Sequence, residues 1–429
     1  MNKIFNLVYD VWDNDNPIAN LKIKYPWMQL SDPDNLILHY MDDTSYVDKF
    51  SKKKCKIEEI FNSEENYYYI VDYGGNQLIE LFVDERDGNN VVIYDPFDEG
   101  IKELFRTQKN LFLMFLTEHE PDCELSFKHL HNYLVENNIP REKVYVVNNN
   151  AKLNDYKVNF NSEINIHSLQ FIPHSSTKVL VRMGGNEFIG DKKGKFFMCF
   201  NKSPKIHRYT LLCYLKRNNL LDDINWSLVP SWNSQPKGDF YKKIFNDDEI
   251  KEFSKEIEYF YNIDIKRSDY EIDKGWFNPY QDINITEFPI WLHIPELMEN
   301  YESSYINIIT ESMFLDDINN IHISEKSFRP FFYYQFPLIL STSGHIKKMK
   351  DRYGFDFYED IINHNYDGEP NQSVRLKMFV KEIKRLNGMK SQLIEYYKDN
   401  KDRFELNKQK VINVLDVVNV DYKFFESLI

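Results

Sequence analysis

The sequence is short of alanine, glycine and cysteine, and it lacks long apolar runs. Only Ala19 and Ala151 are alanines among its 429 residues, and glycine occurs 14 times. Its four cysteines are widely separated: Cys55, Cys123, Cys199 and Cys213. Without a Cys-x-x-Cys pair, neither a zinc ribbon nor a disulfide framework is indicated. No run of about 18 apolar residues occurs, so no membrane span is predicted. We therefore expect a reduced, cytoplasmic protein.

Several signatures of common enzyme classes are also missing. The sequence contains no GxGxxG, Walker A, HExxH or GxSxG pattern, which argues against classical dehydrogenases, P-loop NTPases, zincins and α/β-hydrolases. The first ten residues lack a basic region followed by an apolar core, so no secretory signal is predicted. The formal net charge of −14 disfavours a surface that binds nucleic acid everywhere, because phosphates need Lys and Arg. It still allows one basic groove.

Aromatic residues are abundant, with 29 Tyr and 32 Phe. Together with many Asn and few Ala or Gly residues, this usage indicates an AT-rich gene of a bacterium, a phage or a large virus. Hydrophobic residues make up 42% of the chain and charged residues 28%, which is enough for an ordinary globular core. At about 150 residues per domain, the length predicts two or three domains.

The first half of the chain alternates short apolar runs with segments of helical spacing. Four runs are predicted as buried strands of a parallel sheet: 67–72, 91–95, 111–117 and 144–148. Helices are expected at 101–108 and 125–137, between the strands. This alternation is typical of a layered α/β domain.

A second α/β unit is predicted from about residue 195. Its expected strands are 195–201, 303–310 and 336–341, and its expected helices are 207–218, 324–334 and 344–353. The segment 230–300 shows no clear period and is interpreted as an insertion or a long loop system. The aromatic residues in and just before it suit either stacking on a sugar or base or an ordinary core: Trp226, Trp232, Trp276, Phe277, Tyr280 and Trp291. From residue 373 the chain is predicted to be helical to its end, with breaks near 387–388 and around 398–403.

The most informative local pattern is Ser-Glu-Lys at 324–326. A serine N-cap followed by Glu325 and Lys326 places a carboxylate and an ammonium at a helix N-terminus, where backbone N–H groups favour phosphate. The carboxylate can accept two ribose hydroxyls, and the ammonium can meet a pyrophosphate. A capped surface helix with solvated charges is the plain alternative.

The stretch 324–341, SEKSFRPFFYYQFPLILS, resembles the donor-binding region of GT-B glycosyltransferases of the α-1,3-fucosyltransferase type. The resemblance implies an α/β GT-B-like fold, with two Rossmann-like domains facing across a cleft and closing C-terminal helices. It implies that Glu325 binds the donor ribose and Lys326 the diphosphate. It also implies a UDP- or GDP-sugar co-substrate, no bound cofactor and no metal.

The segment 200–208 resembles an N-R-x-x-R-x-H-R pattern that begins the donor domain of phage and bacterial glycosyltransferase-like proteins. Lys202 and Lys205 replace its two arginines, which keeps the charge but loses the bidentate fork. His207 and Arg208 are retained. The resemblance implies a diphosphate site that includes Lys202, His207 and Arg208.

A third segment, 354–375, resembles a pattern that follows the Pro-containing strand in the same group. Its acidic pair is replaced at Asn363 and His364, which puts a catalytic role for that pair in doubt. Tyr366 and Asp367 are kept, and we expect them to tie the C-terminal helices to the donor domain.

The N-terminal half is then expected to bind the acceptor and to supply a general base. The predicted domains are an acceptor domain at 1–190 and a donor domain at 191–429, with an insertion at about 230–300. Residues that follow predicted strands are the candidates, because active-site loops lie there. Glu99, His119 and Glu120 are preferred over Asp72.

These inferences predict a glycosyltransferase that moves a sugar from a nucleotide sugar to a hydroxyl acceptor. The acceptor is a surface glycan or, in a phage or virus acting in the host cytoplasm, a modified base in DNA. The DNA acceptor predicts a basic track, to which 52–54 and 192–193 would contribute. A non-catalytic binding protein on a degenerate glycosyltransferase scaffold is the alternative. The oligomeric state is left open.

Overall fold

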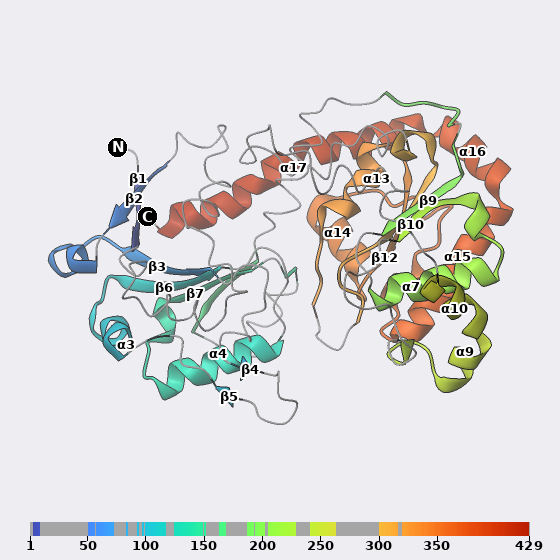
Figure 1. Ribbon diagram of the computed structural model, residues 1–429. Helices are drawn as coiled ribbons and strands as arrows, with labels where there is room; N and C mark the ends of the chain where they lie inside the picture. The colour runs from blue at the N-terminus through green and yellow to red at the C-terminus, as the bar shows by residue number, and fades with distance from the viewer. Residues whose placement is uncertain are drawn as a thin grey trace, which may run out of the picture. The chain divides into compact units, whose positions relative to one another are not determined.

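The structure, a computed structural model, consists of two compact units (Figure 1). It describes residues 3–8, 50–55, 57–72, 83–84, 92–93, 97, 99–116, 124–148, 150–151, 163–168, 187–192, 194–201, 205–228, 241–262, 300–315 and 320–428. Unit 1 comprises Met1–Ile172, Asp317–His322 and Asp416–Ile429. Unit 2 comprises Pro173–Asp316 and Ile323–Leu415.

Unit 1 contains a six-stranded parallel sheet with the strand order β2-β1-β3-β6-β7-β8. Its strands are β1 (Lys3–Val8), β2 (Phe50–Cys55), β3 (Tyr67–Asp72), β6 (Leu111–Leu116), β7 (Val144–Asn148) and β8 (Asn165–Ser168). The predicted strands 67–72, 111–117 and 144–148 are confirmed. Sequence patterning missed β2, whose three successive lysines interrupt any apolar run.

The prediction of a parallel-sheet strand at 91–95 is wrong. Of that run the structure describes Val92–Ile93 (β5), which pairs antiparallel with Val83–Asp84 (β4) in a separate two-stranded sheet. β5 pairs with β4 because β4 is close in sequence. Antiparallel strands need only a short connection, whereas parallel strands need a long crossover.

One face of the unit 1 sheet packs against α3 (Glu99–Thr107) and α4 (Glu124–Glu136), which confirms the two predicted helices. Alternate residues of neighbouring strands share this core, as the two-residue period of a strand requires. Aromatic rings fill much of it: the centroids of Tyr69 and Phe105 are 5.4 Å apart, and those of Phe97 and Phe105 are 5.6 Å apart. Short 3-10 helices lie at Ile57–Asn62 (η2) and Arg141–Lys143 (η4).

Unit 2 contains a four-stranded parallel sheet with the order β10-β9-β11-β12. The strands are β9 (Phe197–Asn201), β10 (Ile224–Leu228), β11 (Ile306–Thr310) and β12 (Phe336–Leu340). Every residue of β11 and β12 is buried, as expected for a parallel sheet covered on both faces. The three predicted strands of this unit are confirmed, and β10 is additional. The predicted α/β class is therefore correct for both units.

Both sheets place their first strand, in chain order, between the second and the third. The second strand of each sheet therefore lies on one side of the first strand, and the later strands lie on the other. The direction in which strands are added reverses at β1/β3 in unit 1 and at β9/β11 in unit 2. Such a reversal is a topological switch point, and ligands of open α/β sheets bind there, outside the carboxyl ends of the strands.

The helices of unit 2 cover its sheet and extend to the end of the chain. They are α7 (Ile206–Arg217), η5 (Leu221–Asp223), α9 (Asp247–Glu252), α10 (Ser254–Asn262), η10 (Glu325–Ser327), α13 (Arg329–Phe332), α14 (His345–Tyr353), η11 (Asn365–Gly368), α15 (Gln372–Gly388), α16 (Lys390–Asp399) and α17 (Lys401–Leu428). The helices predicted at 207–218, 344–353 and from 373 onward are confirmed. The residues of α17 from Asp416 onward belong to unit 1. Within the described residues, no helix combines the length and hydropathy needed to cross a membrane.

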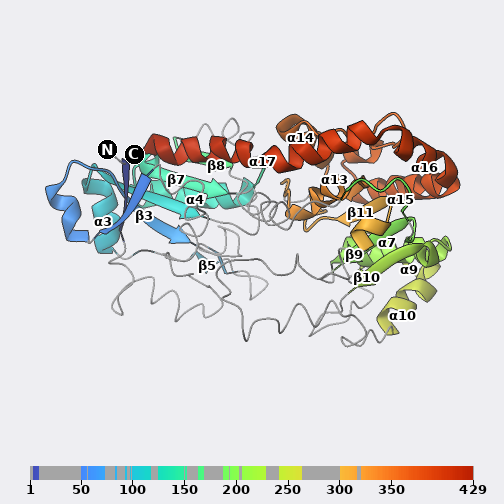
Figure 2. The ribbon, with the colours of Figure 1, turned by 90° about the horizontal axis from the view of Figure 1, so that it is seen from above.

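Two helical predictions need correction. The segment 324–334 is not one helix but η10 followed by α13, and Pro330, which has no N–H to donate, lies in the first turn of α13. The supposedly irregular 230–300 contains α9 and α10; α10 lies against α7, and α9 lies next to α10 (Figures 1 and 2). An Asn246 capping box begins α9.

Aromatic packing explains why these two helices form in a segment without a clear period. The ring of Phe253 lies 4.6 Å from that of Tyr214, and Phe260 lies 5.8 Å from Trp226. Trp226 is half-buried, and its ring packs edge-on against the buried ring of Phe260. The other aromatic residues proposed for stacking lie outside the described part of the chain: Trp232, Trp276, Phe277, Tyr280 and Trp291.

Candidate functional site at the carboxyl edge of the second sheet

The carboxyl ends of β9, β10 and β11 are joined by polar side chains at the switch point of unit 2. Thr310, the last residue of β11, donates its hydroxyl to the side-chain oxygen of Asn201, the last residue of β9. The backbone N–H of Asn201 donates to Ser227 Oγ of β10 at 3.1 Å. All three side chains are buried, so these hydrogen bonds are shielded from water.

Glu311, the residue directly after β11, is the centre of the site. Its side chain is fully buried. Oε2 accepts the hydroxyl of Ser324 at 2.7 Å, and Oε1 accepts that of Ser327 at 2.5 Å. The backbone N–H groups of Ser324 and Ser312 also donate to the carboxylate, each at 3.3 Å. These four donors offset the cost of burying a carboxylate, which is high without hydrogen bonds.

Sequence reasoning missed Glu311, although a signal for it exists. The residue follows a buried parallel strand, and the same rule selected Glu99 and Glu120 in the first half of the chain.

Ser324 is the N-cap of η10, as predicted, and it places Lys326 beside the Glu311 cluster. Lys326 Nζ lies 3.2 Å from Ser324 Oγ and 3.1 Å from Glu325 Oε1. The Lys326 side chain is 31% exposed, whereas that of Glu325 is 5% exposed. The Lys326 ammonium therefore contacts the buried network on one side and solvent on the other.

Glu325 lies between two cations. Its Oε1 is 3.1 Å from Lys326 Nζ and 3.2 Å from a guanidinium nitrogen of Arg329, which in turn donates to the Tyr301 hydroxyl at 3.0 Å. Burial on its own would raise the pKa of Glu325, but Lys326 and Arg329 outweigh it and lower that pKa. Glu325 is therefore ionised, and it holds Lys326 in place.

His207 and Arg208 lie in the first turn of α7 and are both buried. His207 Nε2 is 2.9 Å from the backbone carbonyl of Glu311, and Arg208 donates to the carbonyl of Thr310 at 3.1 Å. Burial, together with the charge of Arg208, lowers the pKa of His207 well below its usual value. The imidazole is therefore neutral, and its Nε2–H donates to the Glu311 carbonyl. These two residues anchor α7 to the segment after β11.

The predicted donor-binding residues thus meet at one edge of one sheet, but in different roles. Lys326 is partly exposed, whereas His207, Arg208 and Glu325 are buried within the framework. Lys205, at the replaced arginine position, donates from Nζ to the backbone carbonyl of Ser312 at 3.0 Å. Lys202 lies outside the described residues.

The N-terminus of α14 completes this edge. Gly344 precedes the helix with a φ of 81°, a left-handed conformation that favours glycine. The Asp367 carboxylate accepts the backbone N–H groups of Ile346 at 2.9 Å and Lys347 at 3.1 Å. Arg375 donates to the carbonyl of Phe314 at 2.7 Å. Asp367 and Arg375 therefore tie the C-terminal segment to this edge, and Asp367 already caps the helix end where an anion would otherwise bind.

The catalytic candidates of the first half are described only in part. Glu99 lies in the first turn of α3, where it pairs with Arg106 at 2.5 Å and Lys102 at 3.3 Å, and its side chain is 70% exposed. Hydrogen bonds from Arg106 and Lys102 lower the pKa of Glu99. His119 and Glu120 lie outside the described residues. Asp72 is the last residue of β3.

Within the described ranges, no group of three His, Cys, Asp or Glu side chains has an arrangement that could hold a metal ion. Comparisons with protein-family models, curated proteins and solved structures give no significant match.

Proposed function

We propose that this chain is a nucleotide-sugar-dependent glycosyltransferase of GT-B-like organisation, in which unit 2 binds the donor. The observation that supports this most is the position of Lys326. It belongs to the segment that resembles a fucosyltransferase-type donor region, and it projects from the carboxyl edge of a parallel sheet at a switch point. This edge is where a donor-binding segment of a Rossmann-like domain has to lie, so the position of Lys326 is what the resemblance requires.

Lys326 would contact the diphosphate of a UDP- or GDP-sugar. When the bond between the sugar and the diphosphate breaks, negative charge grows on the leaving oxygen, and an ammonium fixed beside it stabilises that charge. Lys326 is held for this purpose by Glu325 and Ser324, at 3.1 and 3.2 Å. In this proposal the cations of the protein neutralise the leaving group, and no metal is invoked.

Glu325 would accept a hydroxyl of the donor ribose. Its Oε1 accepts from both Lys326 and Arg329. When Lys326, still held by Ser324, also donates to the diphosphate, its pairing with Glu325 Oε1 weakens, and a ribose hydroxyl can donate to that oxygen as well. Binding of the two halves of the nucleotide would then be coupled through one carboxylate.

Catalysis further requires a base that takes the proton of the acceptor hydroxyl while its oxygen bonds to the anomeric carbon. The candidates remain Glu99, His119 and Glu120. Glu99 does not resemble a base with a raised pKa, because it is exposed and ion-paired within its own helix. This observation argues against Glu99 as the base. If neither His119 nor Glu120 acts as the base, the second candidate function is a protein that binds a nucleotide sugar without transferring it.

The acceptor would be a surface glycan or a modified base in DNA. Of the lysines expected to form a basic track, Lys192 donates from Nζ to the carbonyls of Glu302 and Tyr333, at 2.9 and 3.1 Å. It is therefore engaged within unit 2. The lysines at 52–54 lie on β2, an edge strand of the unit 1 sheet.

Release of nucleoside diphosphate from UDP-, GDP- and CDP-sugars tests the proposal. We expect one of these donors to be turned over, and Lys326→Gln to reduce turnover at least tenfold, about 1.4 kcal/mol of lost stabilisation. Lys347→Gln is the matched control, since Lys347 is an exposed lysine of the same unit that pairs with Asp351. Binding without release would support the non-catalytic alternative, and the absence of any binding would refute both functions.

A further inference from the structure

We infer that Glu311 is a positioning residue that acts through two chains of hydrogen bonds, here called arms. In the first arm it fixes the tautomer of His345 through Ser327, and in the second it places the Lys326 ammonium through Ser324. The role of Lys326 toward a diphosphate rests on the proposed function, whereas the tautomer of His345 does not. The inference follows from counting the protons of a buried hydrogen-bond chain that joins these residues.

The Ser327 hydroxyl determines the direction of the first arm. Ser327 Oγ lies 2.5 Å from Glu311 Oε1 and 3.0 Å from His345 Nε2, and it has one proton. The Glu311 carboxyl group faces two hydroxyl and two backbone N–H donors, which favour its ionised form. An ionised carboxylate can only accept, so the proton of Ser327 points to Glu311. The Ser327 oxygen must then accept from the histidine, which places a proton on His345 Nε2.

Ser341 completes this arm on the other side of the ring. Its Oγ lies 3.1 Å from His345 Nδ1 and 3.3 Å from the Met313 carbonyl. Burial lowers the pKa of His345 despite the opposing charges of Glu311 and Asp367, so the ring carries one proton, on Nε2. Nδ1 is then an acceptor, and the single proton of Ser341 goes to this nearer acceptor rather than to the Met313 carbonyl. The order of donation runs from Ser341 through His345 and Ser327 to Glu311.

The second arm runs from solvent to the same carboxylate. Lys326 has three donor protons and no acceptor, so it donates to Ser324 Oγ at 3.2 Å. Ser324 in turn donates its proton to Glu311 Oε2 at 2.7 Å. A negative charge at the end of this chain strengthens both hydrogen bonds. Lys326 is the only member of either arm that we place against the ligand.

A carboxylate can serve both arms, but an amide cannot. Glu311 presents an acceptor oxygen to each serine. In Glu311→Gln one of the two positions becomes an NH₂ donor. If the NH₂ faces Ser327, that hydroxyl turns toward His345 and the tautomer changes to Nδ1–H. If it faces Ser324, that hydroxyl loses its acceptor and its bond to Lys326 weakens.

The test combines histidine ¹⁵N NMR with calorimetric titration of inorganic pyrophosphate, on the full chain. His345→Gln identifies the His345 signals among the 11 histidines. We expect wild type to show the Nε2–H tautomer. We expect Glu311→Gln to change that tautomer or to weaken pyrophosphate binding about tenfold. Ser324→Ala, a milder change, should weaken pyrophosphate binding about tenfold and leave the tautomer as it is.

Glu382→Gln is the control for burying an amide in this unit. Glu382 is also buried, and it accepts from Arg385 and from the backbone N–H of Asn363. This variant should change neither readout. A wild-type Nδ1–H tautomer would overturn the inference. So would wild-type behaviour of Glu311→Gln in both readouts.

The two proposals can fail separately. If wild type turns over a nucleotide sugar but Glu311→Gln matches it in tautomer and in pyrophosphate affinity, the positioning role is wrong and the function stands. If wild type binds neither pyrophosphate nor a nucleotide sugar, the function and the Lys326 arm both fall. The His345 spectrum then decides the remaining arm on its own.

Discussion

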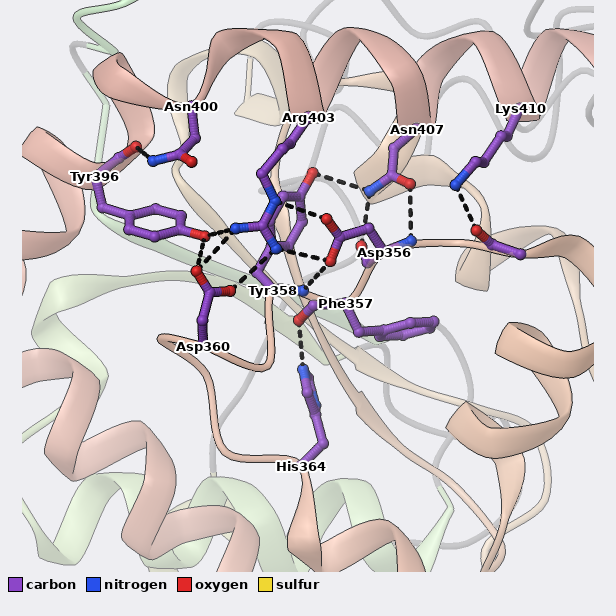
Figure 3. A network of polar contacts seen from close by, with 11 residues as sticks. Asp356, Phe357, Tyr358, Asp360, His364, Tyr396, Asn400, Arg403, Asn407 and Lys410 are labelled. Atoms are coloured by element: carbon purple, nitrogen blue, oxygen red, sulfur yellow. Dashed lines mark hydrogen bonds and ion pairs between the residues drawn. The ribbon is translucent and has the colours of Figure 1, made fainter.

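The two edges of the unit 2 sheet are both held by charged networks, but these networks are balanced differently. At the carboxyl edge, the buried Glu311 carboxylate is satisfied by hydroxyl and backbone donors. At the amino edge, Arg403 pairs with two carboxylates, Asp356 and Asp360 (Figure 3). The amino edge can be located because Phe336, the first residue of β12, packs against Tyr358 and Phe404.

The amino-edge network is closed. Arg403 contacts Asp356 at 2.7 and 2.9 Å and Asp360 at 2.8 and 3.0 Å. Asn407 exchanges hydrogen bonds with the backbone of Asp356 at 2.9 and 2.7 Å, as Figure 3 shows. Arg403, Asp356 and Asp360 each have a partner of opposite charge. These ion pairs stabilise the packing of α17 against the segment that contains the two aspartates.

The carboxyl-edge network is open at one end. Its chain of donors begins at Lys326, whose side chain is partly exposed and can take up an anion. We therefore expect the amino edge to contribute to stability and the carboxyl edge to bind the ligand. Ligands of open α/β sheets bind outside the carboxyl ends of the strands. Three predictions test this division.

The largest expected effect is a pH dependence of stability that arises from His364, in the segment beside Arg403. Burial lowers the pKa of His364 to about 4 from 6.5, and Nε2 lies 2.9 Å from the Phe357 carbonyl. Between these values the unfolded chain binds a proton that the folded chain does not. The free energy of unfolding should therefore fall as the pH falls from 6.5 to 4, by about 3 kcal/mol.

Urea unfolding of wild type and His364→Gln at pH 7 and pH 4.5 measures this contribution. The variant should lose less stability on acidification, although the buried His207 and His345, whose pKa values are also lowered, still contribute in the same direction. Equal losses in the two proteins would show that His364 is not held neutral by burial.

The next effect is that of Arg403→Met, which leaves Asp356 and Asp360 without their cation. Because these groups are partly exposed, we expect the free energy of unfolding to fall by only about 2 kcal/mol. The affinity for pyrophosphate should be that of wild type. A variant that folds normally but binds pyrophosphate more weakly would contradict the division between the edges.

The smallest effect is expected for Ser341→Ala at the carboxyl edge. The substitution leaves His345 Nδ1 without its donor at 3.1 Å, which should cost about 1 kcal/mol of stability. Ser341 belongs to the first arm, whereas Lys326 belongs to the second. The thermal unfolding temperature should therefore fall while the pyrophosphate affinity stays that of wild type. A loss of affinity comparable to that of Ser324→Ala would mean that the two arms are not separate.

Much of this edge could be predicted from the sequence. Continuous apolar runs identified β11 and β12, because parallel strands buried on both faces leave no alternation to misread. The Ser-Glu-Lys pattern identified the cap at Ser324 because capping is a local interaction.

What the sequence did not reveal depends on contacts between distant segments. A single Glu311 after a strand looks like a solvated turn until Ser324 and Ser327 are brought to it. Likewise, the neighbouring sequence does not indicate that Glu325 will be buried between Lys326 and Arg329. It also does not indicate that Arg208 will donate to a backbone carbonyl. The formation of α9 and α10 depends on aromatic partners such as Tyr214, which belongs to α7.

The most direct test of the account is titration calorimetry of UDP and GDP into wild type and Lys326→Gln, with Lys347→Gln as the control. The central claim is that the carboxyl edge of unit 2 binds a nucleoside diphosphate through Lys326. We predict that wild type and Lys347→Gln bind at least one of the two with equal affinity, and that Lys326→Gln binds it at least tenfold more weakly, about 1.4 kcal/mol. Equal affinity in all three proteins, or no binding by wild type, would contradict the claim.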